Sequence, residues 1–278
     1  MRILLILILA PLYAVNAQPN TEVYLFDLNK SGGLYSISNP YNVSAQNPGY
    51  DNQPHFAPDR SLLYTGARNG QTDVIRFDLA TKKSTNETNT PQNEYSPTPV
   101  PNQNTFSCIY DSIQNLVKYS PNSSREILIA DLVVGYHSWF DDKTVVVFAL
   151  GDVFTLQSYN IETKVKQILD ENIGRSLHKI PGQDRISYIS KKSDPWTIIS
   201  INPLTGSKKT LATTLEGVED MAWTPDGMML MGKGNKLYQF DAMKGWLEIA
   251  DLSVFNLSGI TRLAVSPDGQ KIAVVVNE

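Results

Sequence analysis

The sequence predicts an all-β protein, a six-bladed β-propeller with four antiparallel strands in each blade. Three observations predict this fold. A turn motif followed by an apolar strand recurs about every 42 residues along the chain. Short alternating stretches recur throughout, and no segment keeps a helical period for three turns. The two ends of the sequence also complement one another as two halves of one repeat.

The turn motif has three strong copies, Pro58-Asp59-Arg60, Pro225-Asp226-Gly227 and Pro267-Asp268-Gly269. Proline presets the first turn position, and the third residue completes a tight hairpin. Weaker copies begin at Pro101, Asp141 and Pro181. The six turn positions are separated by 43, 40, 40, 44 and 42 residues, the period of a four-stranded propeller blade.

The second half of each unit repeats as well. A strand that ends in Asp or Asn leads into a turn, because these side chains bond their own backbone. Such strands are expected at 73–78, 156–160, 198–202 and 237–241, and fourth strands at 126–130 and 247–250. The polar run from Ser84 to Gln103 is predicted to be a long loop at a blade edge.

The ends explain each other. The last repeat stops at Glu278 after two strands, whereas 22–27 and 33–37 read as third and fourth strands that lack the first two. Joined, they complete a sixth blade and leave no open sheet edge. We therefore expect a single propeller domain over residues 18–278.

The first 17 residues have a basic start, a short apolar run and the small-x-small ending Val15-Asn16-Ala17, which is typical of a secretory signal peptide. We expect cleavage after Ala17, export to the periplasm or the exterior, and no membrane insertion, because no later apolar run is long enough to span a bilayer.

The amino-acid composition limits the classes of molecule that we expect this protein to bind. The net charge is −4 with both signs dispersed, which argues against nucleic acid as a partner. Cys108 is the only cysteine, so no disulfide forms within the chain, and it is expected to be a small buried hydrophobe. We expect a monomer.

The Pro-Asp-Gly turn, the apolar strand after it and the segment "TDVIRFDLATKK" resemble the WD40-like (PD40) repeats of the TolB-like six-bladed propellers. The resemblance covers nearly the whole chain after residue 17. It implies this fold, a periplasmic location and partner binding across one face of the ring. It does not define a reaction, because the motif residues shape turns and packing.

Candidate site residues follow from the repeat. The innermost strand of a propeller blade lines the central channel, and it should occupy about five residues before each turn. This places His55, His137 and His178 at the channel, from three different blades. The other expected residues of the channel rim are Gln53, Tyr95, Tyr136, Arg175, Glu219, Asp220 and Arg262. Trp139 and Trp223 align with Phe56 and are expected to pack between blades.

The leading hypothesis is a non-enzymatic binding or scaffold protein that uses the channel mouth and needs no cofactor. Its partner would be an envelope or extracellular protein, or a small polar ligand such as a glycan. The alternative is a metal-assisted carbohydrate lyase, similar in kind to oligogalacturonate lyases, whose propellers hold manganese with histidines and a glutamine. In that case His55, His137 and His178 would hold a divalent metal beside Gln53.

Overall fold

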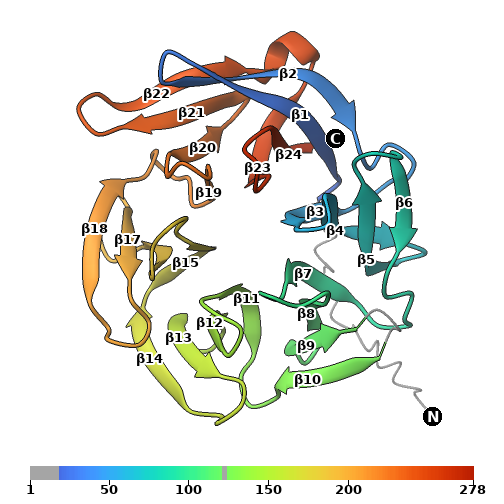
Figure 1. Ribbon diagram of the computed structural model, residues 1–278, viewed down its shortest axis with the longest axis vertical. Helices are drawn as coiled ribbons and strands as arrows, with labels where there is room; N and C mark the ends of the chain where they lie inside the picture. Colours follow the sequence, from blue (N-terminus) through green and yellow to red (C-terminus); the bar gives the residue numbers. More distant parts are fainter. Residues whose placement is uncertain (1–18, 121–123) are drawn as a thin grey trace, which may run out of the picture.

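The computed structural model describes residues 19–120 and 124–278, and its strands form a ring of six four-stranded antiparallel sheets around a central channel (Figure 1). The six-bladed propeller predicted from the repeat is confirmed. The expected signal peptide, residues 1–17, lies outside the described residues. No helix in the described part of the chain is long and apolar enough to cross a membrane.

The blades are numbered along the chain, and the first strand named in each is the one nearest the channel. Blade 1 consists of β3 (Asp51–Ala57), β4 (Ser61–Arg68), β5 (Gln71–Asp78) and β6 (Lys83–Asn86). Blade 2 consists of β7 (Glu94–Pro99), β8 (Phe106–Tyr110), β9 (Asn115–Tyr119) and β10 (Arg125–Ile129). Blade 3 consists of β11 (Val134–Trp139), β12 (Thr144–Ala149), β13 (Thr155–Asn160) and β14 (Lys166–Glu171).

The other three blades follow the same plan, and the last one is shared between the two ends. Blade 4 consists of β15 (Ile173–Lys179), β16 (Ile186–Ser190), β17 (Thr197–Ile201) and β18 (Lys208–Thr213). Blade 5 consists of β19 (Met221–Trp223), β20 (Met229–Lys233), β21 (Lys236–Asp241) and β22 (Gly245–Asp251), and the 3-10 helix η1 (Leu252–Phe255) follows it. Blade 6 consists of β23 (Ser258–Val265), β24 (Lys271–Asn277), β1 (Thr21–Ser31) and β2 (Leu34–Asn42).

The ring closes in blade 6 as predicted. Strand β1 pairs with β24 in an unbroken antiparallel register from Thr21 opposite Asn277 to Asp27 opposite Lys271. The contact surface is apolar, since Val23, Val274 and Val275 are fully buried. The pairing leaves neither β1 nor β24 as an open edge, which protects both from edge-to-edge association.

The turn chemistry explains why the repeat is visible in the sequence. In the third turn position Gly227 has φ +85° and Arg60 has φ +62°, so both adopt the left-handed conformation that ends the hairpin. In blade 6 the Ser266 hydroxyl donates to Asp268 Oδ1 over 2.6 Å, so the turn aspartate is engaged locally. These aspartates shape turns, as expected.

Tryptophan packing between blades is also confirmed. Trp139 of blade 3 is buried and donates its Nε1–H to Ser107 Oγ of blade 2 over 2.9 Å. Trp223 of blade 5 makes the equivalent bond to Ser187 Oγ of blade 4 over 2.8 Å. Cys108 is fully buried among apolar side chains, as predicted.

The prediction of a long loop at 84–103 is wrong in part. This stretch contains most of the outer strand β6 and the whole inner strand β7. Its polar composition has a physical cause, because β6 faces solvent and needs no apolar side chains. The turn signals in β7 were misleading as well, since Pro97 and Pro99 lie within a short inner strand.

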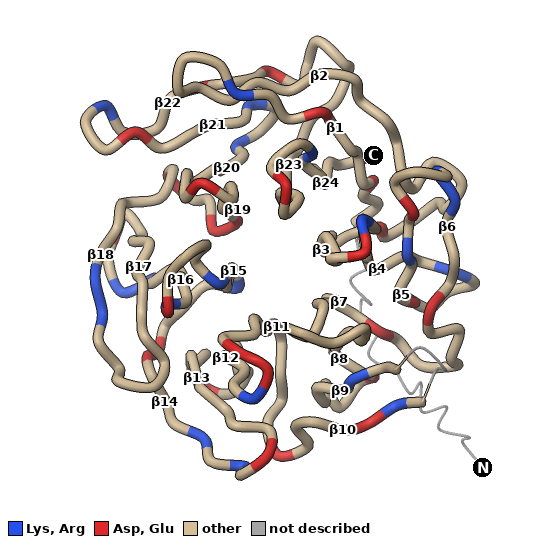
Figure 2. The backbone as a smooth tube through the Cα atoms, viewed as in Figure 1, with Lys and Arg blue, Asp and Glu red and all other residues tan. Residues whose placement is uncertain are grey.

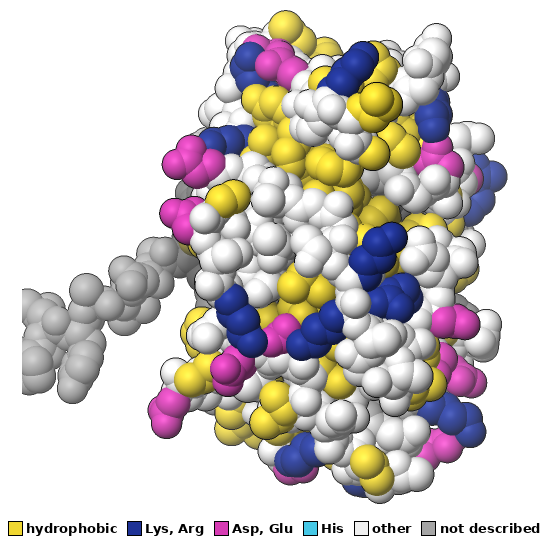
Figure 3. All heavy atoms as spheres, turned by 90° about the vertical axis from the view of Figure 1, so that its left-hand side faces the viewer, with side chains coloured by type: hydrophobic (Ala, Val, Ile, Leu, Met, Phe, Trp, Pro, Cys, Tyr) yellow, Lys and Arg dark blue, Asp and Glu magenta, His cyan; other side chains and the backbone are white. Residues whose placement is uncertain are grey.

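The outer surface mixes charge and apolar groups. Figure 3 shows the side of the ring at the left of Figure 1, where hydrophobic side chains form a strip above a group of basic and acidic side chains. Exposed apolar residues on the outer strands and loops of blades 3 to 5 include Val165, Ile168, Leu204 and Met243.

Candidate functional site

The predicted rim residues converge on one constriction of the channel. We call six of them the rim ring, one from each blade: Gln53, Tyr95, Tyr136, Arg175, Asp220 and Arg262. All of them except Tyr95 line a narrow space of about 90 Å³ inside the channel. Tyr95 lies beside it, with its ring 6.5 Å from that of Tyr50 in an edge-on arrangement.

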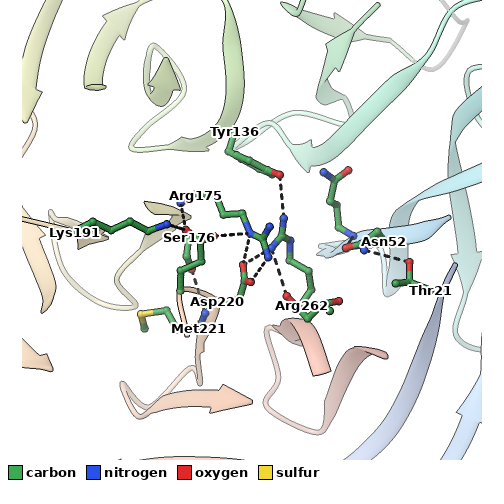
Figure 4. Close-up of polar contacts among 12 residues, drawn as sticks. Thr21, Asn52, Tyr136, Arg175, Ser176, Lys191, Asp220, Met221 and Arg262 are labelled. Atoms are coloured by element: carbon green, nitrogen blue, oxygen red, sulfur yellow. Dashed lines mark hydrogen bonds and ion pairs between the residues drawn. The ribbon is translucent and has the colours of Figure 1, made fainter. Parts of the chain in front are cut away.

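Ion pairs and hydrogen bonds span the channel at this level (Figure 4). Asp220 accepts hydrogen bonds from Arg175 Nη2 over 2.6 Å and from Arg175 Nε over 3.2 Å. Arg262 donates to the same carboxylate through Nη1 and to the Tyr136 hydroxyl through Nη2 over 3.1 Å. Tyr136 and Arg262 belong to blades 3 and 6, so this bridge joins opposite sides of the ring.

The carboxylate of Glu219 lies next to this network and contacts Arg175 as well. Glu219 Oε2 accepts a hydrogen bond from the backbone amide of Arg175 over 3.2 Å and lies 2.8 Å from Lys191 Nζ. Lys191 in turn lies over the ring of Trp196, 4.3 Å from its centroid. Three cationic side chains and two carboxylates therefore meet here, which leaves one positive charge in excess. The basic segment of β15 and the acidic segment before β19 face each other in Figure 2.

The other half of the rim ring carries tyrosine side chains and the amide side chain of Gln53. Gln53 has φ +55°, and its Oε1 accepts from Thr65 Oγ1 and from the backbone amide of Ser96, each over 2.8 Å. It thus joins blade 1 to blade 2. Burial raises the pKa of the half-buried Tyr50 well above its usual value, so this hydroxyl stays neutral next to the arginines.

Two members of this site were missed at the sequence level. Tyr50 lies eight residues before Pro58 and directly before β3, outside the five-residue window. Lys191 follows β16 and is not on an inner strand at all. Register shifts occur at the same level in the inner strands β7, β11, β15 and β23. Such bulges re-aim side chains, and turn spacing does not reveal them.

The three histidines form a layer between the rim ring and the turn side of the channel. His137 is buried, and its Nε2 lies 2.7 Å from Ser107 Oγ. His178 Nε2 lies 2.9 Å from Ser176 Oγ, and His55 is exposed to the channel. Enclosure by protein lowers the pKa of His178 to about 4 and that of the buried His137 to about 3, and the channel walls lower the pKa of His55 as well. All three imidazoles are therefore neutral near pH 7.

The residues do not fit a metal centre. Over residues 19–120 and 124–278, no three His, Cys, Asp or Glu side chains gather closely enough to hold a metal ion. Serine hydroxyls engage two of the imidazoles, and the Gln53 carbonyl already accepts two hydrogen bonds. In this structure the three histidines therefore share a layer of the channel without gathering into a coordination set.

Comparison with known proteins gives a fold and no family. No family model matches the sequence, and no curated protein matches it. Among solved structures, a TolB candidate from Agrobacterium tumefaciens has a TM-score of 0.70 at 16% identity, covering 94% of this chain and 99% of that one. A gluconolactonase from Xanthomonas campestris has a TM-score of 0.65 at 9% identity, with 95% and 99% coverage. An oligogalacturonate lyase from Vibrio parahaemolyticus has a TM-score of 0.56 at 11% identity, with 94% and 98% coverage.

This chain shares only its fold with these solved structures. These neighbours range from a TolB-like protein to two enzymes, so the propeller alone selects none of their activities.

Proposed function

We propose that this chain is an exported, non-enzymatic binding module that holds a segment of a protein partner at the rim ring. The observation that carries the proposal is the arrangement of the ring itself. One side offers aromatic faces, and the other offers a hydrogen-bonded set of arginines and carboxylates with one positive charge in excess. Aromatic and arginine side chains are enriched in protein recognition sites.

The geometry of the rim ring favours the binding of a ligand over catalysis. Arg175 and Glu219 remain 34% and 20% exposed, whereas Asp220 and Arg262 are held at 14% and 13%. Asp220 thus holds Arg175 in place, and Arg175 and Lys191 hold Glu219, so a ligand meets side chains that need little further ordering. A carboxylate of the partner would lie against Arg175, and an apolar side chain would lie against the tyrosines.

The alternative of a metal-assisted lyase has less support. It needs a set of ligands that the histidine layer does not provide among the described residues. The lyase neighbour, at 11% identity, contributes only a shared fold.

The proposal is tested with a random peptide library selected on the immobilised chain without residues 1–17. Arg262→Ala should weaken the selected peptides by roughly 10- to 100-fold, because a central arginine contributes about 2 kcal/mol or more to such sites. Arg125→Ala is the matched control, since this arginine packs on Tyr110 at the outer strand β10. Equal affinity for both variants, at comparable melting temperatures, would exclude the rim ring as the binding site.

A further inference from the structure

The other end of the channel holds a separate cavity. It has a volume of about 470 Å³ and lies on the turn side of the histidine layer. The bridge between Tyr136 and Arg262 narrows the channel beyond that layer, where only about 90 Å³ remains. The cavity is therefore a cup with the imidazoles near its floor. Its volume lies within the range of small-molecule sites.

The wall of the cup is apolar and carries no carboxylate. Trp139 and Trp223 line it, together with proline rings contributed by four of the six blades. Among the described residues that line it, Lys179 is the one with a charged side chain apart from the histidines. Its Nζ lies 4.0 Å from the centroid of the Phe140 ring and 3.7 Å from Asp184 Oδ1, so this charge is already partnered.

The three imidazoles differ in what they present to the cup. His137 Nδ1 is buried without a hydrogen-bond partner among the described residues and does not reach the open space. His178 is engaged with the hydroxyl of Ser176. All three imidazoles border both the cup and the constriction, and His55 is the exposed member. As a neutral imidazole it offers one hydrogen-bond donor and one acceptor.

We infer that this cup binds an uncharged small molecule with an apolar ring and a hydroxyl group that hydrogen-bonds to His55. The apolar wall favours a ring, because burial of apolar surface contributes about 25 cal/mol per Å². A charged ligand would lose its hydration without a free counter-charge in the wall. None of the six rim-ring residues lines the cup. The inference about the cup therefore does not depend on the proposed function.

The test uses three probes of similar size: phenol, anisole, which lacks the hydroxyl donor, and benzoate, which is charged. Phenol should bind with a dissociation constant on the order of millimolar, given its small size. Anisole and benzoate should bind about 5-fold more weakly or worse, the factor expected for one lost hydrogen bond. The readout is the imidazole ¹⁵N chemical shift of His55 on titration at about pH 7, which also locates the probe.

Two variants complete the experiment. His55→Leu should abolish the preference for phenol over anisole, whereas His55→Gln, which keeps a donor and an acceptor, should retain it. Because neither variant has the His55 imidazole, binding to them is followed by the indole ¹⁵N chemical shift of Trp223, which also lines the cup. His55 is exposed to the channel, and we expect both variants to fold. The inference is overturned if anisole or benzoate binds as tightly as phenol to the unmodified protein. The inference is also overturned if phenol leaves the imidazole ¹⁵N chemical shift of His55 unchanged.

Discussion

Asp51 provides a sensitive probe of how the ring is closed. Its carboxyl is fully buried next to the closing strands, and the Thr21 hydroxyl donates to its backbone carbonyl over 2.9 Å. Asn47 donates to Oδ1, but Oδ2 has no partner among the described residues. Burial raises the pKa of Asp51 to about 8, against the hydrogen bond from Asn47, and the nearby carboxylates of Glu22 and Glu278 raise it further.

The sign of the effect follows from proton binding. An unfolded aspartate titrates near pH 4, so between about pH 4 and pH 8 the folded state binds more protons than the unfolded state. The free energy of unfolding therefore falls as the pH rises through this window. Since one pKa unit corresponds to about 1.4 kcal/mol, the upper limit of the loss is on the order of 5 kcal/mol. Relaxation of the site would reduce it to a few kcal/mol.

Asp51→Asn removes this titration and keeps an acceptor for Asn47. We expect the variant to be more stable than the parent by about 1–3 kcal/mol at about pH 8.5, and nearly equal to it at about pH 4. Urea unfolding at both pH values measures the difference. The exposed Asp142→Asn serves as the control. A loss of stability of the same size at both pH values would refute the reasoning, because it would show that Asp51 is ionised and satisfied in the fold.

Three further predictions concern closure and packing between blades. Deletion of residues 18–42, which removes β1 and β2, should expose β24 and cause aggregation in sedimentation velocity; a monomeric truncation that unfolds cooperatively would contradict the shared blade. Ser107→Ala should cost about 1–3 kcal/mol in urea unfolding, because it leaves Trp139 Nε1 and His137 Nε2 buried without this partner, whereas the exposed Ser112→Ala should change little. Asp170→Asn should destabilise the protein near pH 7: burial opposes ionisation of this carboxyl, but hydrogen bonds from Lys192, Lys208 and Tyr188 hold its pKa well below the usual value. The destabilisation should be constant above about pH 5 and should shrink as the pH falls below about 4, where the unfolded carboxyl takes up a proton before the folded one does. An effect of Asp170→Asn that does not change with pH would argue against these ion pairs.

The sequence was sufficient for the ring because each blade repeats its turn chemistry. Pro-Asp turns, Asp or Asn at strand ends, and the split repeat at the two termini are local features that need no knowledge of contacts. The same spacing placed the rim residues on the channel correctly. Residues five or six positions before a turn lie on the inner strand or, in the case of Glu219 and Asp220, directly before it.

What the sequence could not supply depends on contacts between blades. The pairing of Arg262 with Tyr136 joins residues 126 positions apart, and no turn spacing specifies it. The three histidines share a layer, but the bulges in β3, β11 and β15 and the hydroxyls of Ser107 and Ser176 fix their rings. The metal hypothesis required a convergence of ring nitrogens that spacing alone cannot establish.

The central claim, that the rim ring holds a protein partner, is tested most directly by photo-crosslinking in cells that export this chain. A photoreactive phenylalanine analogue replaces Tyr95 of the rim ring or, as the control, the exposed Tyr41 on the outer strand β2. We expect a discrete adduct with one protein from position 95, which Arg262→Ala abolishes, and none from position 41. Absence of an adduct at position 95, or the same adducts from both positions, would contradict the claim.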